Sequence, residues 1–210
     1  MPRRELTIPP FGLDATLDLP EGAAGLVLFA HGSGSSRLSP RNRQVSTALN
    51  AGGIATVLFD LLTEAESRDR RNVFDIPLLA RRLVLATRHV CQLPELRDLP
   101  VGFFGASTGA AAALEAAADL GAAISAVVSR GGRPDLAMEA LPRVTAPTLL
   151  IVGGEDREVL MLNRRAHAAL ACAKRLEIVA GATHLFEEPG TLEQVIALAT
   201  AWFRMYLASA

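Results

Sequence analysis

The stretch Val101-Gly-Phe-Phe-Gly-Ala-Ser-Thr-Gly109 decides the fold of this chain. It holds an apolar run, Val101–Phe104, then the pattern G-x-S-x-G, and it leads into an alanine-rich stretch with helical spacing, Thr108–Leu120. A strand that turns at once into a helix holds the residue between them in a strained conformation, and the two glycines let the elements approach closely. Ser107 is therefore predicted to stand out at the carboxyl end of a strand.

Further apolar runs without alternation lie on both sides of this stretch, and such runs are typical of strands buried on both faces of a sheet. Segments with helical spacing lie between them. This alternation predicts an α/β fold with a mostly parallel central sheet and helices on both faces. The predicted strands are Gly25–Ala30, Ile54–Phe59, Val101–Phe104, Ile124–Val128, Thr148–Val152 and, more weakly, Leu176–Val179, and the predicted helices are Arg41–Ala51, Phe74–Cys91, Thr108–Leu120, Val159–Ala171 and Thr191–Leu207.

Segments outside this alternation are short. Leu6–Pro10 and Ala15–Leu19 alternate briefly between apolar and polar residues, which predicts an antiparallel hairpin at a sheet edge. Ser129–Pro147 has room for at most one short helix, so we expect an open site and no large lid domain. No low-complexity linker interrupts the 210 residues, and we predict a single domain over residues 1–210.

Composition constrains the partners of the chain. Hydrophobic residues make up 50% and charged residues 20% of it, close to the usual balance of soluble proteins. A formal net charge of -1 argues against nucleic-acid or membrane partners held by bulk electrostatics. No apolar signal segment follows the start, and charges interrupt the alanine-rich stretch Ala110–Ala126, so we expect a cytoplasmic location. The oligomeric state stays open.

Two other strand ends supply the groups that a reactive serine needs. A serine hydroxyl is a weak nucleophile unless a base removes its proton and a third group orients that base. Asp156 follows Thr148–Val152 and His184 follows Leu176–Val179, and ligands of open parallel sheets bind at this edge. We predict Ser107 as nucleophile, His184 as general base and Asp156 as the acid that orients it.

Each partner of the serine has a plainer alternative. Asp156 could cap the helix that follows it, because Asp is a favoured N-cap residue, and the neighbouring Glu155 is a rival acid. His184 could be a solvated loop residue. Its competitors, His89 and His167, lie within helical patterns, where a surface role is natural.

The loop His31–Ser36 is predicted to complete the site with a backbone N–H group that binds an oxyanion. Ser33 is the predicted donor, with Gly34 as the alternative. The N–H of Thr108 is the other donor, because the positive end of the helix it begins faces the same point. His31 itself is predicted to be structural.

The same loop allows a different function, nucleotide binding. Gly32-Ser33-Gly34 follows a strand and Asp60 ends the next one, as in a dinucleotide-binding turn. The third glycine of that motif would fall at Arg37, however, and Asp60 lies 28 residues beyond Gly32 instead of about 20. A non-catalytic protein that binds a nucleotide or another small ligand stays the alternative function.

Arg130 and Arg133 are predicted to contact substrate if the substrate is an anion. The alternative is that they are solvated surface residues whose charge nearby acids offset. No metal site or cofactor is predicted, since Cys91 and Cys172 lack a C-x-x-C partner or a ligand cluster and are taken as packed thiols. A small molecule is the expected partner.

Six stretches of the chain carry a family resemblance, which covers nearly its whole length. They are F-A-H-G-S-G-S-S at Phe29–Ser36, L-F-D-L-L-T-E at Leu58–Glu64, G-A-S-T-G at Gly105–Gly109, S-R-G-G-R-P-D-L at Ser129–Leu136, L-I-V-G-G-E-D at Leu150–Asp156 and G-A-T-H-L-F-E-E-P-G at Gly181–Gly190. On these residues the chain resembles the dienelactone hydrolase-like group of α/β-hydrolases, in particular small hydrolases encoded with or fused to phosphoribosyltransferase domains.

The resemblance implies the α/β-hydrolase fold and a Ser107–Asp156–His184 triad, which agrees with the assignment made from spacing. It implies a serine hydrolase acting on an ester, lactone or related acyl bond of a small molecule. Dienelactone hydrolases proper use a cysteine nucleophile where this chain has Ser107. Their specific lactone substrate is therefore not carried over.

Overall fold

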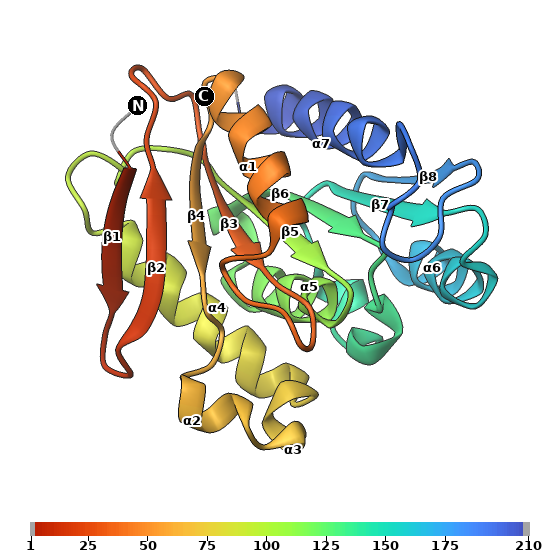
Figure 1. Ribbon diagram of the computed structural model, residues 1–210, viewed down its shortest axis with the longest axis horizontal. Helices are drawn as coiled ribbons and strands as arrows, with labels where there is room; N and C mark the ends of the chain where they lie inside the picture. The colour runs from red at the N-terminus through yellow and green to blue at the C-terminus, as the bar shows by residue number, and fades with distance from the viewer. Residues whose placement is uncertain (1–2, 208–210) are drawn as a thin grey trace.

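A single eight-stranded sheet forms the centre of the structure, a computed structural model that describes residues 3–207 (Figure 1). The strand order is β1-β2-β4-β3-β5-β6-β7-β8. The first two strands form an antiparallel hairpin that adds to the edge of β4, and the other six run parallel. The strands are β1 (Arg3–Ile8), β2 (Leu13–Asp18), β3 (Leu26–Ala30), β4 (Ala55–Phe59), β5 (Val101–Ala106), β6 (Ile124–Arg130), β7 (Thr148–Gly153) and β8 (Lys174–Val179).

Helices cover both faces of the sheet. α1 and α7 pack on one face, and α4, α5 and α6 on the other (Figure 1). Within residues 3–207, none of the helices is long and apolar enough to cross a membrane. The helices are α1 (Pro40–Ala51), α2 (Glu64–Ser67), α3 (Arg70–Val73), α4 (Ile76–Val90), α5 (Thr108–Leu120), α6 (Arg157–Ala169) and α7 (Thr191–Leu207), with short 3-10 helices at η1 (Gly121–Ala123), η2 (Pro134–Ala137) and η3 (Leu141–Arg143).

Successive residues of the central strands enter two separate apolar cores. Phe103 of β5 and Leu28 of β3 belong to the core under α4 and α5. The next residues, Phe104 and Phe29, pack ring to ring at 4.9 Å in the core under α1 and α7. Because both faces are covered, these strands are buried throughout, which is why their sequences show no alternation.

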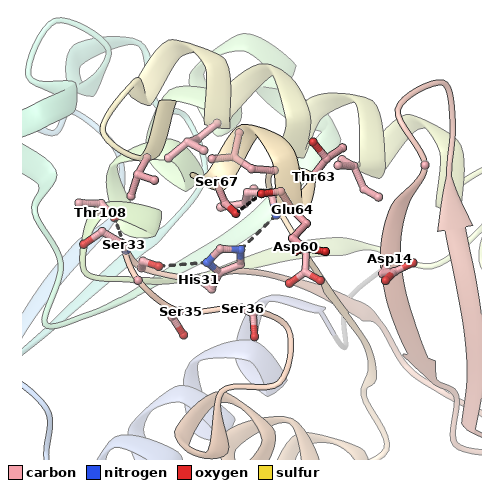
Figure 2. A pocket seen from close by; sticks show the side chains of 18 residues that line it. Asp14, His31, Ser33, Ser35, Ser36, Asp60, Thr63, Glu64, Ser67 and Thr108 are labelled. Atoms are coloured by element: carbon pink, nitrogen blue, oxygen red, sulfur yellow. Dashed lines mark hydrogen bonds between the residues drawn. The ribbon is translucent and has the colours of Figure 1, made fainter. Parts of the chain in front are cut away.

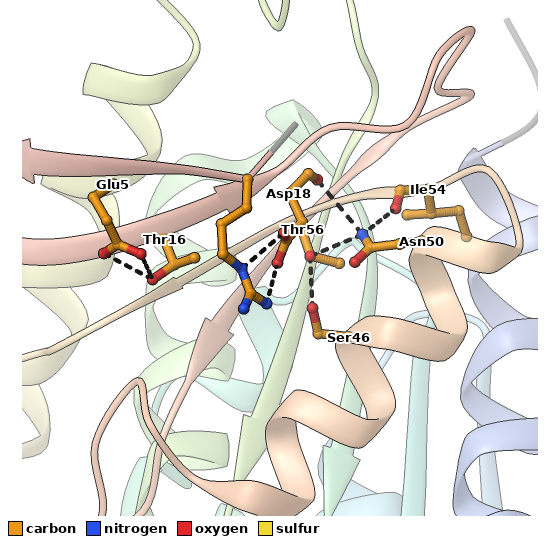
Figure 3. Close-up of polar contacts among 8 residues, drawn as sticks. Glu5, Thr16, Asp18, Ser46, Asn50, Ile54 and Thr56 are labelled. Atoms are coloured by element: carbon orange, nitrogen blue, oxygen red, sulfur yellow. Dashed lines mark hydrogen bonds and ion pairs between the residues drawn. The ribbon is translucent and has the colours of Figure 1, made fainter. Parts of the chain in front are cut away.

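Buried polar contacts fix α1 against the sheet (Figure 3). The Ser46 and Thr56 hydroxyls lie 2.7 Å apart, and the Asn50 side-chain amide donates to the Thr56 hydroxyl and to the Ile54 carbonyl, each at 3.0 Å. A bidentate pair between Arg3 and Asp18, at 3.1 Å, ties β1 to β2 beside them. These bonds fix the carboxyl-terminal half of α1 against β4.

The predicted order and type of the main elements are confirmed, but several element boundaries shift and other details are wrong. α1 begins at Pro40, one residue before the predicted start, because proline suits the first helical turn and the Ser39 hydroxyl caps it. Two four-residue helices after β4, α2 and α3, were not predicted. The segment 129–147 holds two 3-10 helices instead of at most one helix, although it forms no large lid.

The turn between β5 and α5 is packed against the end of β3 with no room for extra atoms. A Cβ at Gly109 would overlap the carbonyl oxygens of Ala30 and His31, and a Cβ at Gly105 would overlap the backbone of Ala110. Both obstacles are backbone atoms, which cannot rotate away. The glycines of G-x-S-x-G are therefore required by close approach of main chain to main chain.

We expect Gly109→Ala to lower the free energy of unfolding by about 3 kcal/mol or more, because overpacking against backbone cannot relax. Gly154→Ala is the matched control, since its nearest obstacle is the Val179 carbonyl oxygen at 3.3 Å. Urea unfolding of both variants measures the difference. Equal, small losses at the two positions would show that the turn tolerates a side chain.

Candidate active site

Ser107 occupies the turn between β5 and α5 in a conformation that side chains rarely adopt. Its φ is 52° and its ψ is -123°. Such backbone costs about 1–3 kcal/mol and persists only where its surroundings impose it. Here the Ser107 N–H donates to the Arg130 carbonyl at 3.2 Å, and the Ser107 carbonyl accepts the Arg133 N–H at 3.0 Å. The last residue of β6 and the loop that follows it thus hold the strained residue from both sides.

The structure brings the three residues predicted from spacing into one hydrogen-bonded chain. His184 Nε2 lies 3.3 Å from the Ser107 hydroxyl oxygen, and His184 Nδ1 lies 2.6 Å from Asp156 Oδ2. The carboxylate can only accept, so Nδ1 carries the hydrogen and Nε2 is free to accept one from the serine. The ring is 38% exposed and the carboxylate 15% exposed.

The competing role for Asp156 is not observed. It stands at the N-cap position of α6, yet its side chain makes no capping bond and turns to His184 instead. Glu155, the rival acid, is exposed. Its backbone N–H donates to the Ala182 carbonyl at 3.0 Å, which joins the loop after β7 to the loop after β8.

A local clasp holds the loop that carries His184. The Glu188 carboxylate accepts the Thr183 hydroxyl at 2.6 Å and the Thr183 N–H at 3.1 Å. The hydroxyl bond, followed by backbone N–H groups, lowers the pKa of Glu188. Phe186, whose φ is 55°, is buried in the core beneath α7. Sequence reasoning missed this clasp, because Glu188 looked like one of several surface acids.

The two predicted oxyanion donors lie side by side, but one is engaged. Thr108 is the first residue of α5, where helix N–H groups have no acceptor within the helix. The Ser33 N–H donates to the hydroxyl oxygen of Thr108 at 2.9 Å. Figure 2 shows this bond at one end of a cavity.

His31 links the loop after β3 to the loop after β4. Its Nδ1 lies 3.0 Å from the Gly32 carbonyl and its Nε2 accepts the Leu61 N–H at 3.1 Å. An imidazole that donates at one nitrogen and accepts at the other is neutral. Burial lowers the pKa of His31, which favours the same neutral form.

A cavity of about 690 Å³ opens beside this site. Apolar side chains from α3, α4 and the loop after β4 line one part of it, and serine and threonine hydroxyls line another (Figure 2). The charged side chains that line it, within residues 3–207, are the carboxylates of Asp14, Asp60 and Glu64. The short helix α2 forms part of the wall of the cavity. The Thr63–Glu66 capping box is a sequence pattern from which this helix could have been predicted.

The structure does not bring Arg130 and Arg133 to this cavity. Arg130 is 7% exposed, reaches Asn42 on the α1 face at 3.5 Å, and has its pKa lowered to about 10 by burial. The expectation that it is a solvated surface residue is wrong, because its position in β6 points into the covered face. Arg133 forms two bonds with Asp135, at 2.9 and 2.8 Å, which raise its pKa.

Asp60, the acid of the dinucleotide-binding alternative, is also engaged. Its Oδ1 accepts the Arg37 backbone N–H at 2.7 Å, so it ties the loop after β3 to the end of β4. Arg37, where the dinucleotide-binding motif would require its third glycine, is therefore hydrogen-bonded to the Asp60 carboxylate.

Comparison with known proteins agrees with the fold. The chain matches the alpha/beta hydrolase domain over residues 23–196, and it therefore belongs to the α/β-hydrolase family. A dienelactone hydrolase from Anabaena variabilis ATCC 29413 is 53% identical to it, with a TM-score of 0.94 and coverage of 98% of this chain and 99% of that one. The predicted resemblance to the dienelactone hydrolase group is confirmed.

Two further comparisons describe other proteins to which this chain is similar. An α/β serine hydrolase without a lid from Xanthomonas campestris shares the fold at 22% identity and a TM-score of 0.79, over 99% of this chain and 96% of that one. Curated proteins from two strains of Mycobacterium tuberculosis, CDC 1551 / Oshkosh and H37Rv, are named phosphoribosyl transferases and are 61% identical over 187 residues. That match covers 89% of this chain and 42% of each relative, so the chain spans less than half of their length.

We expect the neutral His31 to make stability depend on pH. The pKa of the free side chain is 6.5 and folding lowers it, so the contribution is complete above pH 6.5 and falls as the pH drops from there toward the folded pKa. His31→Gln cannot titrate. Urea unfolding should show wild type about 1–2 kcal/mol more stable than this variant at pH 8, and the gap should narrow toward pH 5. A constant gap would contradict the buried neutral histidine.

Proposed function

We propose that this protein is a serine hydrolase that cleaves an ester, lactone or related acyl bond of a small molecule through an acyl-enzyme on Ser107. The observation that carries the proposal is the hydrogen-bonded chain from the Ser107 hydroxyl through His184 to Asp156. A base within reach of a serine, itself oriented by a carboxylate, is the arrangement that activates this nucleophile.

In the proposed reaction, His184 Nε2 takes the proton of the Ser107 hydroxyl as the oxygen attacks the substrate carbonyl carbon. Asp156 holds the ring in the required tautomer and stabilises the imidazolium that forms. The imidazolium then returns the proton to the leaving alcohol. Water, deprotonated by the same histidine, releases the acyl group and restores Ser107.

Charge that develops on the carbonyl oxygen needs donors placed in advance. The Thr108 N–H is one such donor in this proposal, because it lies at the amino end of α5 next to Ser107. The second donor in this proposal comes from the region where the loop after β3 meets α5, at the hydrogen bond between Ser33 and Thr108.

The cavity beside Ser33 and Thr108 is the proposed substrate pocket, and its charge is one-sided. At the hairpin end the Arg37 guanidinium lies 3.5 to 3.9 Å from three carboxylates, those of Glu5, Asp14 and Asp60. One positive charge among three negative ones leaves that end acidic. The pocket therefore favours neutral or positively charged substrates over anions.

A fluorophosphonate probe tests the nucleophile without knowledge of the substrate. We expect wild-type protein to gain the mass of one phosphonyl adduct and Ser107→Ala to gain none, as measured by intact-protein mass spectrometry. Asp156→Asn should slow labelling by about 100-fold or more, because the histidine loses its tautomer and its counter-charge.

Glu155→Gln is the matched control, because it removes the neighbouring carboxylate and should label at the wild-type rate. A folded wild-type protein that resists the probe would turn the assignment toward the alternative, a non-catalytic protein that binds a small ligand.

Paired esters test the charge of the pocket. We expect kcat/KM to be about tenfold higher for p-nitrophenyl butyrate than for the p-nitrophenyl monoester of succinic acid, because the acidic end repels the carboxylate. Asp14→Asn should narrow that ratio about threefold, since the Asp14 side chain is 64% exposed and partly screened. Asp98→Asn, in the exposed loop before β5, should leave the ratio unchanged.

The opposite result would be a preference of the wild type for the anionic ester that Arg133→Ala abolishes. It would support the sequence-based prediction that an arginine binds an acidic substrate.

A further inference from the structure

The hydroxyl of Thr108 is hydrogen-bonded to one of the two predicted oxyanion donors, the Ser33 N–H, and belongs to the residue that carries the other. Its oxygen accepts the Ser33 N–H at 2.9 Å, and the side chain is 4% exposed while it lines the cavity. A hydroxyl has one hydrogen to donate in addition to two acceptor positions. In the described part of the chain, residues 3–207, no group accepts that hydrogen.

This contact follows from the close packing of the loop on the turn. A Cβ at Gly32 would lie 3.0 Å from the Ser107 Cβ and 3.1 Å from the Ala106 carbonyl oxygen, so the loop rests directly on the β5–α5 turn. The next residue, Ser33, then has its N–H beside the first residue of α5. Main-chain packing therefore sets the position of the Thr108 hydroxyl.

We infer that the Thr108 hydroxyl itself donates to the oxyanion formed on Ser107, while the Ser33 N–H positions and polarises that hydroxyl. The inference rests on the proposed hydrolase function and assigns Thr108 two donors, its N–H and its O–H. Ser33 becomes a positioning residue. Its hydrogen bond strengthens the donor, because hydrogen bonds in a chain polarise one another.

No proton moves to or from Thr108 in this step. The Ser107 oxygen forms a bond to the carbonyl carbon, the serine proton passes to His184 Nε2, and the π electrons of the carbonyl move onto its oxygen. The Thr108 O–H and N–H donate hydrogen bonds to that oxygen. When the tetrahedral centre collapses, the carbonyl re-forms, the leaving alcohol takes the proton from His184, and both donors stay in place.

Energetics favour this arrangement over direct donation by Ser33. To reach the oxyanion, the Ser33 N–H would have to give up its 2.9 Å bond during the reaction. Donors that are already oriented act without such reorganisation and contribute more to the rate. The hydroxyl hydrogen of Thr108 is available to donate without breaking any hydrogen bond within residues 3–207.

Two substitutions at one position separate the alternatives. Thr108→Val keeps the shape, removes the hydroxyl and leaves the Ser33 N–H free. We expect it to lower kcat for p-nitrophenyl butyrate about 100-fold, the effect of losing one oxyanion donor, with KM changed less than threefold. Thr108→Ser keeps the hydroxyl and should restore most of kcat. If the Ser33 N–H were the direct donor, Thr108→Val would be as active as wild type, which would overturn the inference.

Inhibition by butaneboronic acid distinguishes an oxyanion contact from a change in shape, because its adduct on serine mimics the tetrahedral intermediate. The inhibition constant of Thr108→Val should rise by about the factor by which kcat/KM falls, and that of Thr108→Ser should not. A fall in kcat/KM with an unchanged inhibition constant would contradict the contact. Thr108→Ala, which also frees the Ser33 N–H, gives the same comparison if the valine variant melts early.

Labelling by the fluorophosphonate probe distinguishes failure of the proposed hydrolase function from failure of the proposed role of the Thr108 hydroxyl. Wild-type labelling together with a fully active Thr108→Val would reject the role of the hydroxyl and leave the hydrolase function standing. Absence of wild-type labelling would reject the hydrolase function and this inference with it.

Discussion

Contact between the backbone of one turn and the backbone of another controls the geometry of this protein. The β5–α5 turn and the loop after β3 approach so closely that a Cβ at Gly109 would overlap backbone atoms and a Cβ at Gly32 would be tightly packed. Ser107 is held between them with a positive φ by hydrogen bonds with the last residue of β6 and the loop that follows it. Because three neighbouring strands of the sheet impose this conformation together, its strain is balanced by the packing of the whole centre of the sheet.

The other half of the site depends on contacts between loops. The loop with Asp156 and the loop with His184 are joined through the Glu155 N–H and the Ala182 carbonyl, and the Thr183–Glu188 clasp closes the second loop on itself. Each loop leaves a different parallel strand at the same edge of the sheet. The short distance between His184 and Asp156 thus follows from the pairing of β7 with β8 together with these contacts between and within the two loops.

Much of this arrangement could be predicted from the sequence, because carboxyl ends of parallel strands must meet at one edge. That rule brought Ser107, Asp156 and His184 together from their order alone. It could not predict which acceptor the Ser33 N–H finds, since that depends on one side-chain rotamer of Thr108. Nor could it place Arg130, whose surroundings follow from which face of β6 the side chain occupies. The helices α2 and α3 were missed because four residues are too few to show a period.

The segment 129–147 has a consequence for how molecules enter and leave. It contains two 3-10 helices that pack against α5, and the His184 ring beside it is 38% exposed. Under the proposed hydrolase function, products would leave without waiting for a lid to open, and water would reach the acyl group on Ser107 directly. Discrimination among substrates would then depend on the walls of the proposed pocket, which carry carboxylates and hydroxyls.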